Sequence, residues 1–198
     1  VGYKGRLLVD YRLEREVSHT AGRGRAPCED AIAYWLEVAG WAEAFNRDRQ
    51  GQFTTLDPSL RRICSHGDGL QEIVEMTIAL RLPLGLPLSD LVGLLTGAWK
   101  GDARVETRAF EEPFRADKRT PLAGAFLAAI RAEGGTPAYL TKTGTSDMNV
   151  VGPRWGCPIV AYGPGDSALD HTPNEHIDLD EYLRAVRVLT RVLDRLSQ

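Results

Sequence analysis

The sequence predicts an α/β (α+β) chain in two parts, and three observations support this prediction. First, stretches with strand and helix periodicity follow one another up to about residue 112 in the order β-α-β-β-α-β, the split βαβ order of ferredoxin-like domains. Second, the pattern changes after Glu111 to long helices separated by short apolar runs. Third, Cys157–Tyr162 (CPIVAY) is apolar throughout, as expected for a strand buried on both faces. We therefore expect one domain over residues 1–112 and a second over residues 113–198.

Alternation and helical spacing define the elements of the first part. In Glu72–Leu82 every second residue from Val74 onward is apolar, which is strand periodicity. Between Cys28 and Phe45, apolar residues recur at a spacing typical of the buried face of a helix: Ile32, Trp35, Leu36 and Ala39. The expected strands are residues 6–13, 60–65, 72–82 and 103–110, and the expected helices are residues 28–45 and 88–99.

The second part reads as half of an α/β layer. Pro121–Ala132 predicts a helix that ends at Gly134 and Gly135, and residues 138–142 and 157–162 predict strands. Residues 146–151 suggest one helical turn. Residues 178–196 predict a long last helix with an apolar face of Leu179, Leu183, Val186, Leu189, Val192 and Leu193. Two strands and two long helices do not close a layer. Because the chain begins with VGYKG and no Met, we expect the missing strands to precede residue 1.

Composition excludes several classes of function. The 198 residues carry a net charge of −3, which gives no whole-chain argument for binding nucleic acid or an anionic membrane surface. No apolar run is long enough to span a bilayer. The three cysteines are widely scattered and form no CxxC pair, so we expect neither a zinc knuckle nor a disulfide framework. A reducing, cytoplasmic compartment is the expectation.

Two histidines, His171 and His176, lie in a Pro-containing loop just before the last helix. Imidazole is the commonest protein metal ligand, and open α/β sheets bind ligands in loops that follow buried strands. The structural alternative is a loop histidine capped by Asp170 or Thr172. Two histidines do not complete a zinc site, which needs three or four ligands.

Three other segments could carry chemistry. Gly144–Asn149 (GTSDMN) is rich in hydroxyl and N–H groups, so it could bind a carboxylate or phosphate, or it could simply cap a helix. His19 follows a predicted strand within VSHTAGRGRAP, where a solvated connection is the structural alternative. The basic residues of PFRADKRTP are either solvated or meet an acidic partner: Arg115, Lys118 and Arg119.

Taken together, these segments resemble the M20 family of zinc-dependent amidohydrolases and exopeptidases. The resemblance rests on GYKGRLLVDYRLEREVSHTAG, on TIALRLPLGLP, and on TKTGTSDMNVVGPRWGCPIVAYGPGDSALDHTPNEHIDLDEYLRAV. It covers essentially the whole chain and is strongest in the last third. Within the family, the GTSDMN and YGPGDSxLDHTPxEHI patterns are most similar to the lysine-biosynthesis branch, whose members release lysine or ornithine from an amino-group carrier protein.

The resemblance implies a lid and dimerisation domain over residues 1–112 and the C-terminal half of a catalytic domain over residues 113–198. It implies that His171 is a metal ligand and that Gly144, Thr145 and Ser146 hold the substrate. His19 would stabilise the oxyanion in the partner subunit's active site. Arg81 matches a position that looks structural. Two zinc ions are implied, with cobalt also possible, and the other ligands and the catalytic Glu would belong to a missing N-terminal half.

The implied activity is hydrolysis of an amide bond that links lysine or ornithine to an acidic carrier protein, or of an N-acyl amino acid. The implied partners are a second copy of the chain and that carrier, which the basic side chains could meet: Arg23, Arg25, Arg115, Lys118 and Arg119. Neither nucleic acid nor membrane is implied. Alternatives are a non-catalytic dimerisation module, an acetylornithine deacetylase, a succinyl-diaminopimelate desuccinylase or a dipeptidase. We expect the chain alone to be inactive.

Overall fold

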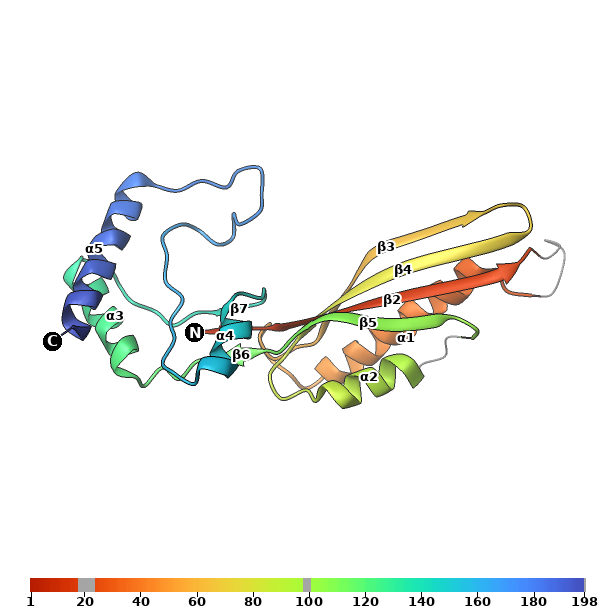
Figure 1. Cartoon of the computed structure of the whole chain (residues 1–198), viewed down its shortest axis with the longest axis horizontal. Helices are drawn as coiled ribbons and strands as arrows, with labels where there is room; N and C mark the ends of the chain where they lie inside the picture. Colours follow the sequence, from red (N-terminus) through yellow and green to blue (C-terminus); the bar gives the residue numbers. More distant parts are fainter. Residues whose placement is uncertain (18–23, 98–100, 198) are drawn as a thin grey trace. The chain divides into compact units, whose positions relative to one another are not determined.

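The computed structural model describes residues 1–17, 24–97 and 101–197, and the chain divides into two compact units (Figure 1). The first, here the sheet unit, comprises Tyr3–Phe114 and Lys142–Val150. The second, the helical unit, comprises Val1–Gly2, Arg115–Thr141 and Val151–Gln198. The units are described separately below. The described residues include no helix that is both long enough and apolar enough to cross a membrane.

The elements of the sheet unit follow the predicted β-α-β-β-α-β order. Its antiparallel strands lie in the spatial order β3-β4-β2-β5 (Figure 1). The strands are β2 (Gly5–Glu16), β3 (Asp57–Gly67), β4 (Gln71–Leu82) and β5 (Arg104–Glu111), and the helices are α1 (Pro27–Asn46) and α2 (Leu88–Gly97). Strands β2, β3 and β4 are each longer than predicted. Polar residues at the strand ends continue the pairing without changing the apolar pattern.

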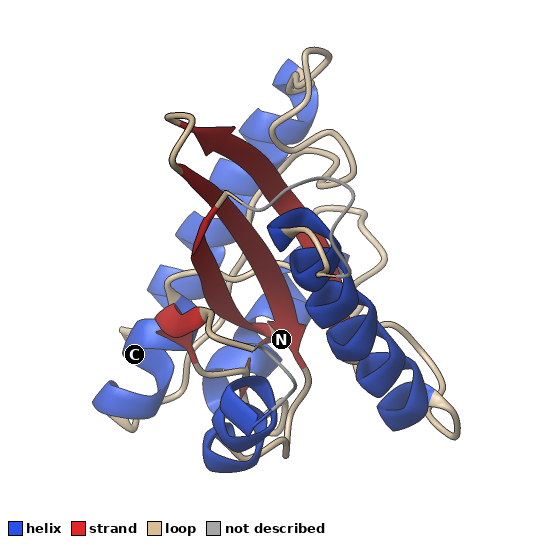
Figure 2. Ribbon diagram, turned by 90° about the vertical axis from the view of Figure 1, so that its right-hand side faces the viewer, coloured by secondary structure: helices blue, strands red, loops and turns tan. Residues whose placement is uncertain are grey.

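One face of this sheet and the two helices form the core of the sheet unit (Figure 2). Alternate residues of β2 and β4 point into it: Leu7, Val9, Tyr11, Leu13, Val74, Met76, Ile78 and Leu80. Tyr34 of α1 packs its ring on Tyr11 at 5.1 Å and donates a hydrogen bond to the carbonyl of Leu95 in α2 at 2.8 Å. Burial raises the pKa of both tyrosines. The opposite face of the sheet carries charged side chains.

Helix α1 buries a different face from the one that its apolar spacing indicated. The buried residues are Ala31, Tyr34, Val38 and Ala42, whereas Ile32 and Leu36 are 48% and 62% exposed. Trp35 is partly buried against the core. Apolar residues occur on both sides of this helix, so periodicity alone does not select the face that meets the sheet.

The helical unit is built on the pair α3 (Pro121–Ala132) and α5 (Leu179–Leu196). Small apolar residues join the two helices: Ala125, Ala129, Val188 and Val192. Helix α3 ends as predicted, with Gly134 at φ 77° and its N–H donating to the carbonyl of Arg131. The carboxylate of Glu133 then accepts hydrogen bonds from Arg187 and Arg191 at 2.8 and 2.6 Å, which ties the end of α3 to α5.

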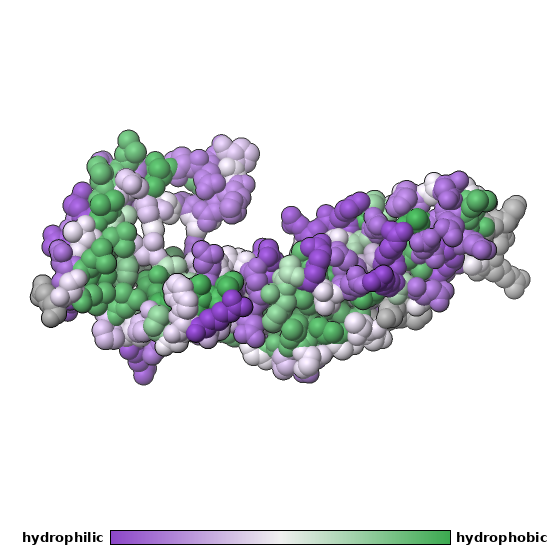
Figure 3. All heavy atoms as spheres, viewed as in Figure 1, coloured by the Kyte–Doolittle hydropathy of each residue, from purple (hydrophilic) through white to green (hydrophobic). Residues whose placement is uncertain are grey.

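The strand predicted over residues 157–162 is wrong: these residues form no strand, and Cys157 is exposed. Among the described residues of this apolar run, Tyr162 alone packs against the α3–α5 cluster, where its ring lies 5.2 Å from that of Phe126. The predicted apolar face of α5 is present but largely exposed, with Leu179 and Leu193 at 72% and 64%, and Figure 3 shows apolar side chains along α5. An apolar stripe is buried only where a neighbour covers it.

The remaining elements are short. They are β1 (Gly2–Tyr3), β6 (Phe114–Arg115), β7 (Thr141–Lys142) and α4 (Met148–Trp155). The predicted strand over residues 138–142 is therefore reduced to two residues, and the predicted helical turn near residue 146 is a two-turn helix that starts later.

Candidate functional site

The His171 loop, defined here as residues 166–175 in the helical unit, is a series of nested turns. The carboxylate of Asp166 accepts the N–H of Ala168 at 2.9 Å, and its carbonyl accepts the N–H of Leu169 at 2.9 Å. The carbonyl of Leu169 accepts both the N–H and the hydroxyl of Thr172, at 3.0 and 2.8 Å. These local bonds order a loop that contains no helix or strand.

His171 has a left-handed backbone, with φ 62°. Its N–H donates to Oε2 of Glu175 at 3.0 Å, and the N–H of Glu175 donates to the carbonyl of Thr172 at 3.1 Å. A left-handed conformation costs a residue with a side chain about 1–2 kcal/mol. A hydrogen bond to a carboxylate contributes about 1.5–3 kcal/mol, with the lower figure appropriate at this exposed position. The bond to Glu175 is therefore large enough to offset the cost of the backbone.

The imidazole of His171 is exposed and makes no hydrogen bond within the described residues. It can therefore act as one ligand of a metal ion. A zinc site needs three or four donors, and no group of three or more His, Cys, Asp and Glu side chains gathers around a possible ion position in residues 1–17, 24–97 and 101–197. His171 thus fits as a single ligand, and the described chain does not supply a complete site.

The ring of His176 makes a hydrogen bond with the backbone. Its Nδ1 lies 2.7 Å from the carbonyl oxygen of Asn174, so in the matching tautomer the ring donates a hydrogen bond there. The contact uses one ring nitrogen and leaves Nε2 open, an arrangement found both in structural histidines and in metal ligands.

The Gly144–Ser146 turn belongs to the sheet unit, and Ser146 in it acts as a helix cap. The Ser146 hydroxyl accepts the N–H of Met148 at 3.2 Å, and the Ser146 N–H donates to Oδ1 of Asn149 at 2.8 Å. The hydroxyl of Thr145 has no hydrogen-bond partner within the described ranges, and the space above Gly144 is open. Of the two hydroxyls predicted to bind substrate, only that of Thr145 is therefore uncommitted.

Asn149 holds this turn in place. It is buried, and its Nδ2 donates to the carbonyls of Lys4 and Glu112 at 3.0 and 2.6 Å. One amide thus joins the turn to the start of β2 and to the chain just after β5. Local sequence does not indicate this role of Asn149, because the two partners lie 145 and 37 residues away.

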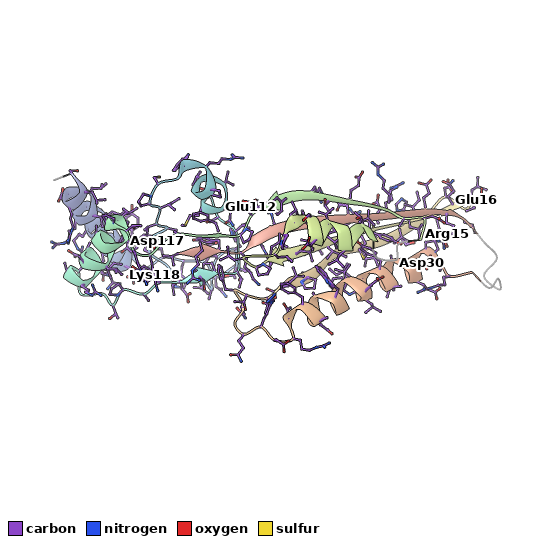
Figure 4. All side chains as sticks on the ribbon, turned by 90° about the horizontal axis from the view of Figure 1, so that it is seen from below. Arg15, Glu16, Asp30, Glu112, Asp117 and Lys118 are labelled. Atoms are coloured by element: carbon purple, nitrogen blue, oxygen red, sulfur yellow. The ribbon has the colours of Figure 1, made fainter. Side chains whose placement is uncertain are left out.

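The prediction for His19 falls outside the described residues, but contacts on either side of it are clear. Arg15 at the end of β2 forms an ion pair with Asp30 of α1 at 2.9 Å (Figure 4), and Arg25 lies 3.3 Å from the same carboxylate. The N–H of Val17 donates to the carbonyl of Leu70 at 2.8 Å. Asp30, which is only 3% exposed, therefore joins the two ends of the segment that contains His19.

A pair of arginines on the open face of the sheet is a feature that the sequence did not reveal. Arg81 of β4 lies directly opposite Arg6 of β2. Nη1 of Arg81 and Nε of Arg6 are buried without a hydrogen-bond partner. Arg6 pairs with Glu111, whereas Asp57, opposite Arg81, pairs with Lys4. Like charges opposite each other are unfavourable, and Glu111 compensates the charge of Arg6. Finding it required the strand register.

Residues 115–119 of the helical unit, here called the basic loop, carry three exposed cations. Arg115, Lys118 and Arg119 form no ion pair with any residue that the structure describes. The carboxylate of Asp117 accepts the N–H of Arg119 in the same loop at 2.8 Å. Figure 4 labels Asp117 beside Lys118. Arg25, in contrast, is engaged by Asp30.

Comparison with known proteins adds a family and relatives. Residues 9–195 match the model of peptidase family M20/M25/M40. The chain is 44% identical over 200 residues to a LysW-lysine hydrolase of Deinococcus radiodurans, covering 99% of this chain and 55% of that protein. It is 35% identical over 200 residues to a putative LysW-lysine/LysW-ornithine hydrolase of Pyrococcus horikoshii, covering 100% and 54%. The chain therefore spans about half the length of these curated relatives.

Solved structures show the same fold. An M20 family metallo-carboxypeptidase from Sulfolobus solfataricus aligns with a TM-score of 0.76 at 17% identity, covering 97% of this chain and 58% of that one. A dipeptidase from Saccharomyces cerevisiae aligns with a TM-score of 0.73 at 10% identity, covering 99% and 55%. The mixed α/β structure thus matches about half of each of these longer chains.

Proposed function

The chain belongs to peptidase family M20/M25/M40, and from that membership we propose that it is the C-terminal part of a metal-dependent amide hydrolase. The proposed substrate is lysine or ornithine in amide linkage to an acidic amino-group carrier protein, the type of substrate named for its LysW-lysine hydrolase relatives. The observation that carries the proposal is the His171 loop, which fixes the backbone of a histidine and leaves its ring uncommitted.

In this proposal His171 is one ligand of a zinc site whose other ligands lie in the part of the protein that this chain lacks. Zinc, when bound, polarises the scissile carbonyl and lowers the pKa of a bound water. Cobalt could serve in its place. The chain's own contribution is to present one neutral imidazole from an ordered loop.

Substrate binding is the second proposed role. The free hydroxyl of Thr145, next to the open space above Gly144, is suited to the backbone or carboxylate of an amino acid. Ser146 belongs to the same turn, but its N–H is already bonded to Asn149. His19 is proposed to stabilise the oxyanion in the partner subunit.

The domain roles follow from the same family. Residues 1–112 are proposed as a ferredoxin-like lid that forms a homodimer, and residues 113–198 as the returning half of the catalytic domain. Ile32 and Leu36, exposed on the outer side of α1, support a lid interface there. The three free cysteines are in keeping with a cytoplasmic location.

The decisive test uses the joined protein, meaning this chain placed behind the N-terminal part of the Deinococcus radiodurans relative. We expect metal-dependent release of lysine from its carrier conjugate, and we expect His171→Ala to abolish it. His176→Ala is the matched control and should retain activity, because the proposed site takes only His171 from these two histidines. Activity that survives His171→Ala would refute the proposal. Comparing acetylornithine, succinyl-diaminopimelate and dipeptides as substrates separates the related hydrolases.

A non-catalytic dimerisation module is the second candidate, and the exposed apolar residues of α1 favour it. Light scattering after size-exclusion chromatography of wild type and Leu36→Glu would show whether α1 forms the interface. Dimerisation is expected under both proposals. The two are therefore separated only by the activity of the joined protein.

A further inference from the structure

The carboxylate of Glu175 is the one side chain in the described part of the chain that holds the backbone of His171. Its Oε2 accepts the His171 N–H at 3.0 Å, across three intervening residues. Glu175 is itself fixed, because its N–H donates to the carbonyl of Thr172 at 3.1 Å. Two other polar side chains of the loop bind elsewhere: Asp166 accepts the N–H of Ala168, and Thr172 donates to the carbonyl of Leu169.

The left-handed backbone of His171 determines where its ring points. The direction of the Cα–Cβ bond follows from φ and ψ, and residues with a side chain rarely adopt φ near 62° unless a specific contact maintains it. The bond from the His171 N–H to Glu175 is such a contact. The ring itself is exposed and makes no bond that would orient it within the described residues.

We propose that Glu175 is a positioning residue that holds His171 in its left-handed conformation and thereby aims the imidazole at a metal ion. The inference rests on the proposed function, in which His171 is a ligand. Glu175 acts through the backbone N–H of the ligand residue, which differs from the usual arrangement in which a carboxylate orients a ligand through its second ring nitrogen.

The alternative role for Glu175 is as a metal ligand itself, and one substitution separates the two. The amide of Glu175→Gln can still accept the His171 N–H through its carbonyl oxygen, but it is a poor ligand for zinc. Glu175→Ala removes both capacities. Asp180→Ala serves as the control, because it removes one negative charge from an exposed residue that makes no side-chain contact within the described ranges.

The first measurement uses the chain as it is. Hydrogen exchange of the residue 171 amide, followed by NMR, should be slow in wild type, Glu175→Gln and Asp180→Ala and fast in Glu175→Ala. Equal exchange in wild type and Glu175→Ala would overturn the inference, since the bond would then not hold the backbone.

The second measurement is the zinc affinity of the joined protein, obtained by competition with a chelator. We expect Glu175→Ala to weaken binding about 10-fold or more, in the range seen when an outer partner of a ligand is removed. Glu175→Gln and Asp180→Ala should match wild type. A loss in Glu175→Gln equal to that in Glu175→Ala would overturn the positioning role in favour of direct ligation.

His171→Ala shows which proposal has failed. If it abolishes binding of one zinc ion while Glu175→Ala has no effect, the inference about Glu175 is wrong and the proposed function stands. If neither substitution changes zinc affinity, the assignment of His171 as a ligand is wrong, and the positioning role is wrong with it.

Discussion

At the scale of single residues, the most informative conformations are left-handed backbones at residues that carry a side chain. Ala109 in β5 has φ 52° at a register shift, where Ala109 and Phe110 together face the single residue Leu7 of β2. This is the two-against-one arrangement of a β-bulge, whose left-handed position usually holds glycine.

Ala109→Gly should therefore stabilise the sheet unit. Relief of the left-handed conformation is worth about 1–2 kcal/mol, and the greater freedom of glycine in the unfolded chain returns about 0.5–1 kcal/mol. We expect a net gain of about 0.5–1 kcal/mol in the free energy of unfolding, measured by urea denaturation. Ala79→Gly, in the regular part of β4, is the matched control and should lose about 0.5–1 kcal/mol. A loss in both variants would contradict the reading of Ala109.

The sequence predicted which residues belong to the candidate site, but not the contacts that they make. Motif resemblance selected His171 and the Gly144–Ser146 turn. The local pattern also offered a helix cap as the alternative for this segment, and Ser146 is such a cap. The sequence did not indicate that Asn149 fixes the turn or that Arg6 and Arg81 lie opposite each other. Both of these facts depend on contacts between distant segments, and local sequence does not encode them.

At the scale of elements, predictions succeeded where the pattern is local and failed where it depends on a neighbour. Helix α3 has the predicted bounds, because Thr120 caps its start, Pro121 occupies the first turn and Gly134 ends it. The buried face of α1 differs from the one that its apolar spacing indicated, because a helix with apolar residues on two sides can meet its neighbour with either.

Helix α5 allows a test of what covers its exposed stripe. In the chain as given, Val188→Ala should destabilise the α3–α5 pair by about 1–3 kcal/mol, whereas Leu189→Ala should have little effect because Leu189 is exposed. In the joined protein we expect Leu189→Ala to cost about 2–5 kcal/mol. Chemical denaturation of both proteins measures this. If Leu189→Ala is neutral in the joined protein, the N-terminal part does not cover this face.

The charged face of the sheet should contribute a defined pH dependence. Hydrogen bonding to Arg108, with a smaller contribution from Thr77, lowers the pKa of Asp10 despite its partial burial. A lowered pKa in the folded state means that the stabilisation is present above the unfolded value near 4 and is lost as the pH falls through the folded value.

Asp10→Asn should therefore reduce stability at pH 6, and the difference from wild type should shrink as the pH falls through the lowered pKa of Asp10. Urea midpoints across this range provide the measurement. Glu14→Gln, in the exposed pair with Arg12, is the control and should have a smaller effect at every pH. A difference that persists at the lowest pH would show that the charge of Asp10 is not its source.

At the scale of the whole molecule, no group of three or more His, Cys, Asp and Glu side chains gathers in the part of the chain that the structure describes, whereas the proposed zinc site needs at least three donors. The chain spans about half the length of its curated relatives. From an α/β layer with too few strands we expected further strands before residue 1; residues 157–162, counted there as one strand of the layer, form none, and the expectation stays a prediction.

The purified chain should accordingly retain no zinc after dialysis, as measured by elemental mass spectrometry, and should show no amide hydrolysis. The joined protein should retain about two zinc ions per chain, the number that the proposed site holds. One or two ions held tightly by this chain alone, and lost in His171→Ala, would mean that it possesses a complete site and that the proposed division is wrong.

The left-handed backbone at residue 171 also bears on how such a chain evolves. Glycine adopts φ 62° without cost, so selection for stability alone would replace the histidine there. His171→Gly is thus a substitution that folding favours. A histidine retained at that position represents a trade-off in which thermodynamic stability yields to another requirement on the same residue.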